Sequence, residues 1–375
     1  MKHRFMVLDV FRGVFASLIF CFHLHFYAGP PILNNGFIAN SDLFVDFFFV
    51  LSGFVISYNY QSISISRELF LFYKKRFSRL YPLHLLMLFV FAGIVLLKHL
   101  IAGHFPEKLP NDPNNNILTF ISNLFLLNSV KMPYASNGAT NPGWNQASWS
   151  ISAEMIAYLL FGAIMLYITH RSLLKYRMWF YLVTAILALT ILSYATGGFS
   201  MMYTYDYGFL RGISGFFIGA FCFTIFDHSY LYFLKIRPFF FTLAETVLIL
   251  LMLWMVSLGG VLKRFGLAYE ILFFLCIFIF SFEKGALSAL LKKPLFLRRM
   301  GAYSYSIYMI HVPFITLFDI LFMRLLKMPL PAYNYLFILE YFVIYIVSGF
   351  TYRYVEMKFY FKDRSSSGSR PKRLP

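Results

Sequence analysis

Long apolar runs follow one another along nearly the whole chain, and short polar stretches separate them. A run of about 20 mainly apolar residues is long enough to cross a bilayer as a helix. The runs of this length cover residues 7–27, 43–60, 82–102, 149–169, 178–196, 207–227, 238–258, 265–283, 301–323 and 334–356. The pattern therefore predicts an all-α fold, a polytopic membrane bundle of about ten transmembrane helices.

Composition supports this interpretation and excludes a large soluble core. The chain is 59% hydrophobic and only 13% charged, about half the charged fraction of a soluble domain. Its mean hydropathy is +0.67. Cys21, Cys222 and Cys276 all fall in apolar runs, without the spacing of a disulfide framework or a metal site. We therefore expect no metal.

The net charge of +17 does not indicate a nucleic-acid partner, because the basic residues lie between the apolar runs. If the N-terminus is cytoplasmic, the inward loops carry Arg67, Lys74, Lys75, Arg76, Arg79, Arg171, Lys175, Arg177, Lys235, Arg237, Lys284, Lys292, Lys293, Arg298 and Arg299. The outward segments carry only Lys108, Lys131, Lys263, Arg264, Arg324 and Lys327. Basic residues favour the cytoplasmic side, so we expect both termini in the cytoplasm.

Two stretches lie outside the predicted spans. Residues 103–148 form the long external segment, in which 117–130 is a short apolar piece that is either interfacial or re-entrant. The polar, basic tail 361–375 is expected to be disordered near an anionic leaflet. Residues 1–360 are therefore predicted to form one integral-membrane domain.

The first apolar run contains Arg12 and His23. Their separation of eleven residues returns to nearly the same helix face at about 100° per residue. Ionisable groups inside a span mark functional sites by default. The alternative for His23 is a structural histidine bonded to a neighbouring helix. His25 points elsewhere on the helix and is the weaker candidate.

Three further charged residues are predicted at the outer level of the membrane. Asp46 begins the second span and is placed to orient His23, although the helix dipole alone would also favour a carboxylate there. Glu154 lies about one turn inside the fourth span, after the interfacial Trp149. Arg211 either contributes to a site or neutralises Glu154 or Asp46.

Arg76 and Arg79 are three residues apart on one helix face, just before Pro82, which is predicted to begin the third span. With Arg12 they would form a cytoplasmic phosphate site, for which the guanidinium fork is well suited. On charge alone, an ordinary positive-inside cluster that binds lipid phosphates would be the better explanation.

Ser304, Tyr308 and His311 form a polar stripe with i, i+4, i+7 spacing in the ninth span. Pro313 follows and is expected to kink the helix, because it removes a backbone hydrogen bond. Such a stripe either lines a channel for a substrate or forms a hydrogen-bonded packing seam.

Together these residues resemble acyltransferase family 3, a family of integral-membrane acyltransferases. The matching blocks are 8–13 with His23, 46–54, 76–79 with Pro82, 149–154, 301–313 and Glu356. The resemblance implies transfer of an acyl group, expected to be acetyl, from cytoplasmic acyl-CoA to a hydroxyl of a cell-surface or exported glycan. It also implies a bacterial plasma-membrane location.

In that interpretation His23 acts as the base or transient acyl carrier, assisted by Asp46 and Glu154. Arg12, Arg76 and Arg79 bind the phosphates of CoA. The stripe of Ser304, Tyr308 and His311 contacts the donor. Trp149 and Arg211 contact the acceptor. The rival hypothesis is a proton-coupled transporter, which also uses intramembrane ionisable residues, but such proteins often show two related halves and this sequence has none.

Overall fold

The computed structural model describes residues 4–27, 31–101, 114–131, 143–198, 200 and 203–360. Eight helices within these ranges are long and apolar enough to cross a membrane. They are α1 (Met6–Tyr27), α3 (Phe44–Asn59), α4 (Ser66–Ile101), α6 (Trp149–His170), α7 (Arg177–Thr196), α8 (Gly208–Leu234), α9 (Pro238–Ser257) and α13 (Leu295–Phe318). The predicted polytopic helical bundle is confirmed.

The other two predicted spans are shorter helices. α11 (Gly266–Phe280) and α15 (Phe337–Thr351) have 15 residues each. At about 1.5 Å per residue each rises about 22 Å, less than the roughly 30 Å of a hydrocarbon core. A π-helical segment (Tyr352–Glu356) and α16 (Met357–Phe359) extend α15 without a break.

Short helical elements connect the long helices. They are Pro31–Leu33, α2 (Gly36–Ala39), Ser41–Leu43, α5 (Ile117–Leu124), Gln146–Ser148, Leu174–Tyr176, α10 (Gly259–Leu262), α12 (Ala286–Leu291), Asp319–Leu325 and α14 (Leu330–Tyr333). α5 begins at a capping box of Asn116 and Thr119 and ends after eight residues. The apolar piece of the external segment is therefore one short helix that does not cross a bilayer. The tail 361–375 and parts of the external segment lie outside the described residues.

The prediction that Pro82 begins a helix is wrong. α4 starts at Ser66 and runs through Pro82 for 36 residues, so it is about 54 Å long. Proline is tolerated inside a transmembrane helix because neighbouring groups satisfy the backbone that it frees. Arg76 and Arg79 consequently belong to the same rigid helix as the apolar span, rather than to a loop before it.

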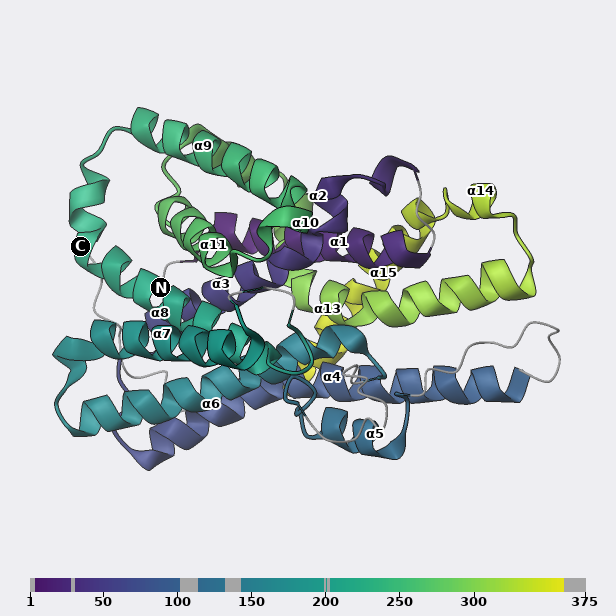
Figure 1. Ribbon diagram of the computed structural model, residues 1–375. Coiled ribbons are helices and arrows are strands. Elements are labelled where there is room, and N and C mark those ends of the chain that lie inside the picture. The colour runs from purple at the N-terminus through teal and green to yellow at the C-terminus, as the bar shows by residue number, and fades with distance from the viewer. Residues whose placement is uncertain are drawn as a thin grey trace.

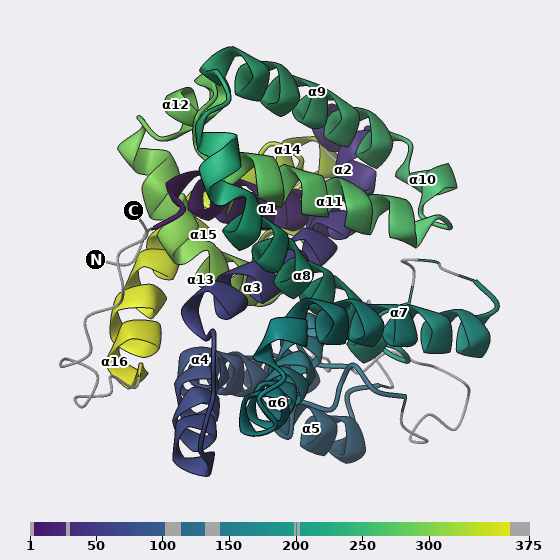
Figure 2. The same ribbon diagram turned by 90° about the vertical axis from the view of Figure 1, so that its left-hand side faces the viewer.

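The long helices lie side by side in Figure 1, and the end-on view in Figure 2 separates centre from rim. α1, α3, α8 and α13 occupy the centre, whereas α9 and α7 lie at the edge and α4 and α6 lie together below. The first turns of α1 and α4 lie at the same end of the bundle (Figure 1).

Two close helix crossings hold this centre together. A Cβ on Gly53 of α3 would lie 1.7 Å from the carbonyl oxygen of Phe216 on α8, and one on Gly219 would lie 1.8 Å from that of Val50. A Cβ on Gly301 of α13 would lie 2.3 Å from the carbonyl oxygen of Asp9 on α1. Glycine lets backbones approach this closely.

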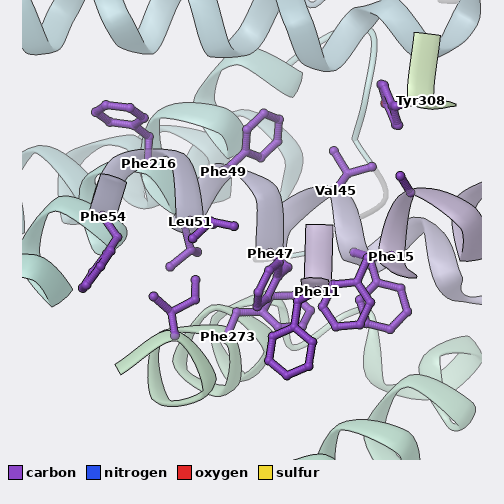
Figure 3. Close-up of a cluster of buried hydrophobic side chains, with 14 of the residues drawn as sticks. Phe11, Phe15, Val45, Phe47, Phe49, Leu51, Phe54, Phe216, Phe273 and Tyr308 are labelled. Atoms are coloured by element: carbon purple, nitrogen blue, oxygen red, sulfur yellow. The ribbon is translucent and has the colours of Figure 1, made fainter. Parts of the chain in front are cut away.

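Aromatic rings fill the space between α1, α3 and α11 (Figure 3). Phe15 stacks on Phe44 at a centroid distance of 4.0 Å, and Phe47 meets Phe273 edge to face at 5.7 Å. These contacts fix the rotation of α3 about its axis. The opposite side of α3, which carries Val45 and Ser52, is thereby turned toward a cavity.

Candidate active site

Five helices surround an open cavity of about 790 Å³, its mouth included. Their polar lining residues are Arg12 of α1, Ser52 of α3, Arg76 and Arg79 of α4, Ser150, Glu154 and Tyr158 of α6, and Ser304, Tyr305 and Tyr308 of α13. The apolar remainder comes mainly from α3. Residues from five separate blocks of the sequence therefore meet in one place.

The three arginines converge on this cavity. Arg76 is 7% exposed, its guanidinium lies 5.6 Å from the centroid of the Tyr60 ring, and its Nε has no hydrogen-bond partner. Among the described residues, no carboxylate forms an ion pair with Arg12, Arg76 or Arg79. Buried cations without counter-ions are costly, so the cavity is suited to an anionic ligand that supplies them.

Glu154 is the one acidic residue in the described lining of the cavity. Its carboxylate accepts hydrogen bonds from the hydroxyls of Ser52, at 2.5 Å, and Tyr158. Those two hydroxyls lie 2.9 Å apart. The acidic group is therefore held by neutral donors, and the lining of three guanidinium groups and one carboxylate keeps an excess of positive charge.

Tyr308 of α13 also lines the cavity. Its hydroxyl accepts a hydrogen bond from Ser150 and donates one to the carbonyl oxygen of Ala147, both at 2.9 Å. Ser304 also lines the cavity, whereas His311 does not. Two members of the predicted stripe, Ser304 and Tyr308, therefore line the cavity, and the third, His311, does not.

His23 and His311 form a pair beyond Tyr308. The Nδ1 atom of His23 lies 3.2 Å from Nε2 of His311 and 2.9 Å from the carbonyl oxygen of Ile19. The Nδ1 atom of His311 lies 2.6 Å from the carbonyl oxygen of Tyr308. His311 is completely buried, and its ring centroid is 5.7 Å from that of Tyr308. The histidine pair is therefore adjacent to the cavity rather than in its lining.

Asp46 binds Arg211 instead of His23. Its two carboxylate oxygens accept hydrogen bonds from Nε of Arg211 at 2.6 Å and from the terminal nitrogen at 2.5 Å, and both side chains are 1% exposed. Within the described residues, His23 contacts no carboxylate. The sequence-based expectation failed here because α3 crosses α8 closely, which brings Asp46 to the guanidinium fork.

Trp149 and Arg211 lie together in the same buried layer. The guanidinium of Arg211 lies 5.2 Å from the centroid of the Trp149 ring, and Trp149 is 6% exposed. Neither side chain lines the cavity. Of the two roles considered for Arg211, the geometry therefore supports the neutralisation of a nearby acid. That acid is Asp46.

Three expected site residues do not share one contact group. His23 contacts His311, Asp46 contacts Arg211, and Glu154 contacts Ser52 and Tyr158. Ser52, Ser150 and Tyr158 were not predicted. Tyr158 could have been predicted from the sequence, because it lies four residues after Glu154 and therefore on the same helix face. In the described part of the chain, no group of His, Cys, Asp or Glu is arranged to hold a metal.

Comparison with known proteins identifies one family. The model of the acyltransferase 3 family, described as an acyltransferase domain, matches residues 7–351. The chain is 33% identical over 155 residues to "Protein 2 in picA locus" of Rhizobium radiobacter, covering 38% of this chain and 75% of that protein. It is 31% identical over 117 residues to "Acyltransferase MdmB" of Streptomyces mycarofaciens, covering 31% of this chain and 26% of that one. No solved structure matches.

Proposed function

Because the chain belongs to acyltransferase family 3 and is an integral-membrane acyltransferase, we propose that its donor is acyl-CoA, carrying an acetyl group. We propose further that the acceptor is a hydroxyl of a cell-surface or exported glycan. The location proposed is a bacterial plasma membrane with both termini cytoplasmic, as the distribution of basic residues favours.

The arginine cavity is the single observation that carries this proposal. Arg12, Arg76 and Arg79 line it and form no ion pair with a carboxylate among the described residues. CoA carries a pyrophosphate and a 3′-phosphate, and guanidinium groups bind phosphate oxygens with two parallel hydrogen bonds. The phosphates of CoA would occupy the arginine side, and the pantetheine arm would run along the apolar face of α3 toward Tyr308.

The proposed chemistry takes place at His23. As a general base, its imidazole removes the proton from the acceptor hydroxyl while the oxygen attacks the thioester carbonyl. The tetrahedral intermediate then expels the CoA thiolate, which receives the proton. In the covalent alternative the imidazole attacks first, CoA leaves, and the acceptor hydroxyl displaces the imidazole from the acyl group. Both routes yield the ester and free CoA.

Glu154 is proposed to orient the donor rather than to contact His23. Its carboxylate is fixed by Ser52 and Tyr158 and lines the same cavity as the arginines. A fixed negative charge opposite three cations would keep the phosphates at the arginine side and leave the neutral thioester arm at the other. Acceptor contacts of Trp149 and Arg211 are not part of the proposal, because both are enclosed around Asp46.

The test uses purified protein in lipid nanodiscs and compares three donors: acetyl-CoA, acetyl-3′-dephospho-CoA and acetyl-pantetheine. Transfer of label to a panel of glycans measures activity. We expect the KM of the donor to rise as each phosphate group is removed. Equal KM values for the three donors would show that the arginine cavity does not bind the phosphates of CoA.

A further inference from the structure

The two imidazoles of His23 and His311 contact carbonyl oxygens that fix where their protons lie. A backbone carbonyl oxygen only accepts hydrogen bonds. Nδ1 of His311 lies 2.6 Å from the carbonyl oxygen of Tyr308, so Nδ1 must carry the proton. A neutral imidazole has one N–H, and Nε2 of His311 is then an acceptor with a free lone pair.

The neutral form of His311 follows from its surroundings. The side chain is completely buried, and its polar neighbours within the described residues are His23 and the backbone carbonyl oxygens of Tyr308 and Ile307. No carboxylate is among them. Burying a charged imidazole there would be costly, so the ring is neutral and presents its lone pair to His23.

The same reasoning then determines which ring nitrogen of His23 carries the proton. Its Nδ1 faces two acceptors, the carbonyl oxygen of Ile19 at 2.9 Å and Nε2 of His311 at 3.2 Å. Nδ1 must therefore donate, and the proton of the neutral ring lies there. The remaining nitrogen, Nε2, has a free lone pair, which is what a base or nucleophile requires.

We propose that His311 is a positioning residue that holds His23 with its lone pair on Nε2, rather than a residue that binds the acyl donor. The inference rests on the proposed role of His23. His311 would act as the third member of a serine protease triad does, by selecting the tautomer and orientation of the reacting imidazole. It differs because its ring is neutral, so it orients His23 without supplying a negative charge.

The step that this arrangement serves is balanced in protons. Nε2 of His23 takes the proton of the acceptor hydroxyl, while Nδ1–H stays bonded to Nε2 of His311. The oxygen forms the new bond to the acyl carbon as the bond from carbon to sulfur breaks. The proton on Nε2 then passes to the CoA thiolate, which returns His23 to its starting tautomer.

The direct test is ¹⁵N NMR of the full-length protein with labelled histidine, because the shift of each ring nitrogen reports whether it is protonated. His23→Gln assigns the His23 signal by its loss. We expect Nδ1 protonated and Nε2 unprotonated in both rings. A His23 ring protonated on Nε2 overturns the proposal. This measurement needs no acyl transfer, so it remains valid if the proposed function fails.

Two substitutions test the role in turnover. His311→Gln places an amide oxygen near the former position of Nε2, whereas His311→Asn reaches only the former position of Nδ1. We expect His311→Asn to lower kcat about tenfold, the rate equivalent of one ordinary hydrogen bond, and His311→Gln to recover most of it. The KM for acyl-CoA should be unchanged in both. A higher KM with normal kcat, or equal kcat in the two variants, overturns the proposal.

Discussion

The side-chain amide of Asn145 donates a hydrogen bond of 3.0 Å to the carbonyl oxygen of Met309, four residues before Pro313. In an unbroken α-helix that oxygen would accept from the N–H of residue 313, which proline lacks. Asn145 comes from the segment that precedes α6, so a residue outside the long helices satisfies the backbone of α13 near the histidine pair.

Replacing Asn145 with leucine should destabilise the protein by about 1–3 kcal/mol, because it leaves a buried carbonyl oxygen unsatisfied. Thermal unfolding in detergent measures the change. Pro313→Ala is the control background, since alanine restores the N–H that bonds to Met309. The cost of Asn145→Leu should be smaller there. An equal cost in both backgrounds would show that the amide stabilises something other than the carbonyl of Met309.

Asp46→Asn should destabilise the fold by about 3–5 kcal/mol, since it leaves the fully buried Arg211 without its counter-charge. The double variant Asp46→Leu/Arg211→Leu removes both charges and should be more stable than the single variant. Unfolding temperature and acyl transfer are measured for both. If the double variant is stable but inactive, Asp46 or Arg211 contributes to catalysis as well as to packing.

Arg76→Gln and Arg79→Gln should each raise the KM for acyl-CoA by about ten- to a hundredfold, the equivalent of losing about 1.5–3 kcal/mol of charged hydrogen bonding. The KM for the acceptor should change little. Arg67→Gln is the matched control, because Arg67 lies on the same helix, is exposed and does not line the cavity. An effect of Arg67→Gln as large as the other two would show that Arg76 and Arg79 act only through the general positive charge of the surface.

His23→Ala should lower acyl transfer by about a hundredfold or more, with protein yield and binding of CoA retained. His25→Ala, two residues away on the same helix, should be much milder. Turnover is measured per mole of purified protein. Normal turnover in His23→Ala would remove it from the mechanism.

Cysteine labelling tests the topology in a background in which Cys21, Cys222 and Cys276 are replaced by serine. Leu118→Cys, on the exposed face of α5, should react with a membrane-impermeant maleimide on intact cells. Arg171→Cys, after the end of α6, should react only once the membrane is permeabilised. The reverse pattern would place the arginine cavity on the outer side.

The sequence predicted eight of its ten spans as helices long enough to cross a membrane, because a run of about 20 apolar residues is typical of a transmembrane helix. It also identified Arg12, Arg76 and Arg79, which line one cavity. The sequence did not predict the contact partners of His23 and Asp46. Helical periodicity says which residues share a face of one helix, but it does not say how α13 is rotated toward α1 or how near α8 comes to α3. Those relations depend on glycine contacts between distant segments.

The contact of Gly301 with the backbone of Asp9 sets a limit on how this molecule opens. A helix pair in backbone contact cannot slide or separate without losing its packing, so α1 and α13 behave as a single rigid unit that carries Arg12, His23, Tyr308 and His311. The groups proposed to react with the donor would therefore keep their alignment while substrates enter and leave the cavity.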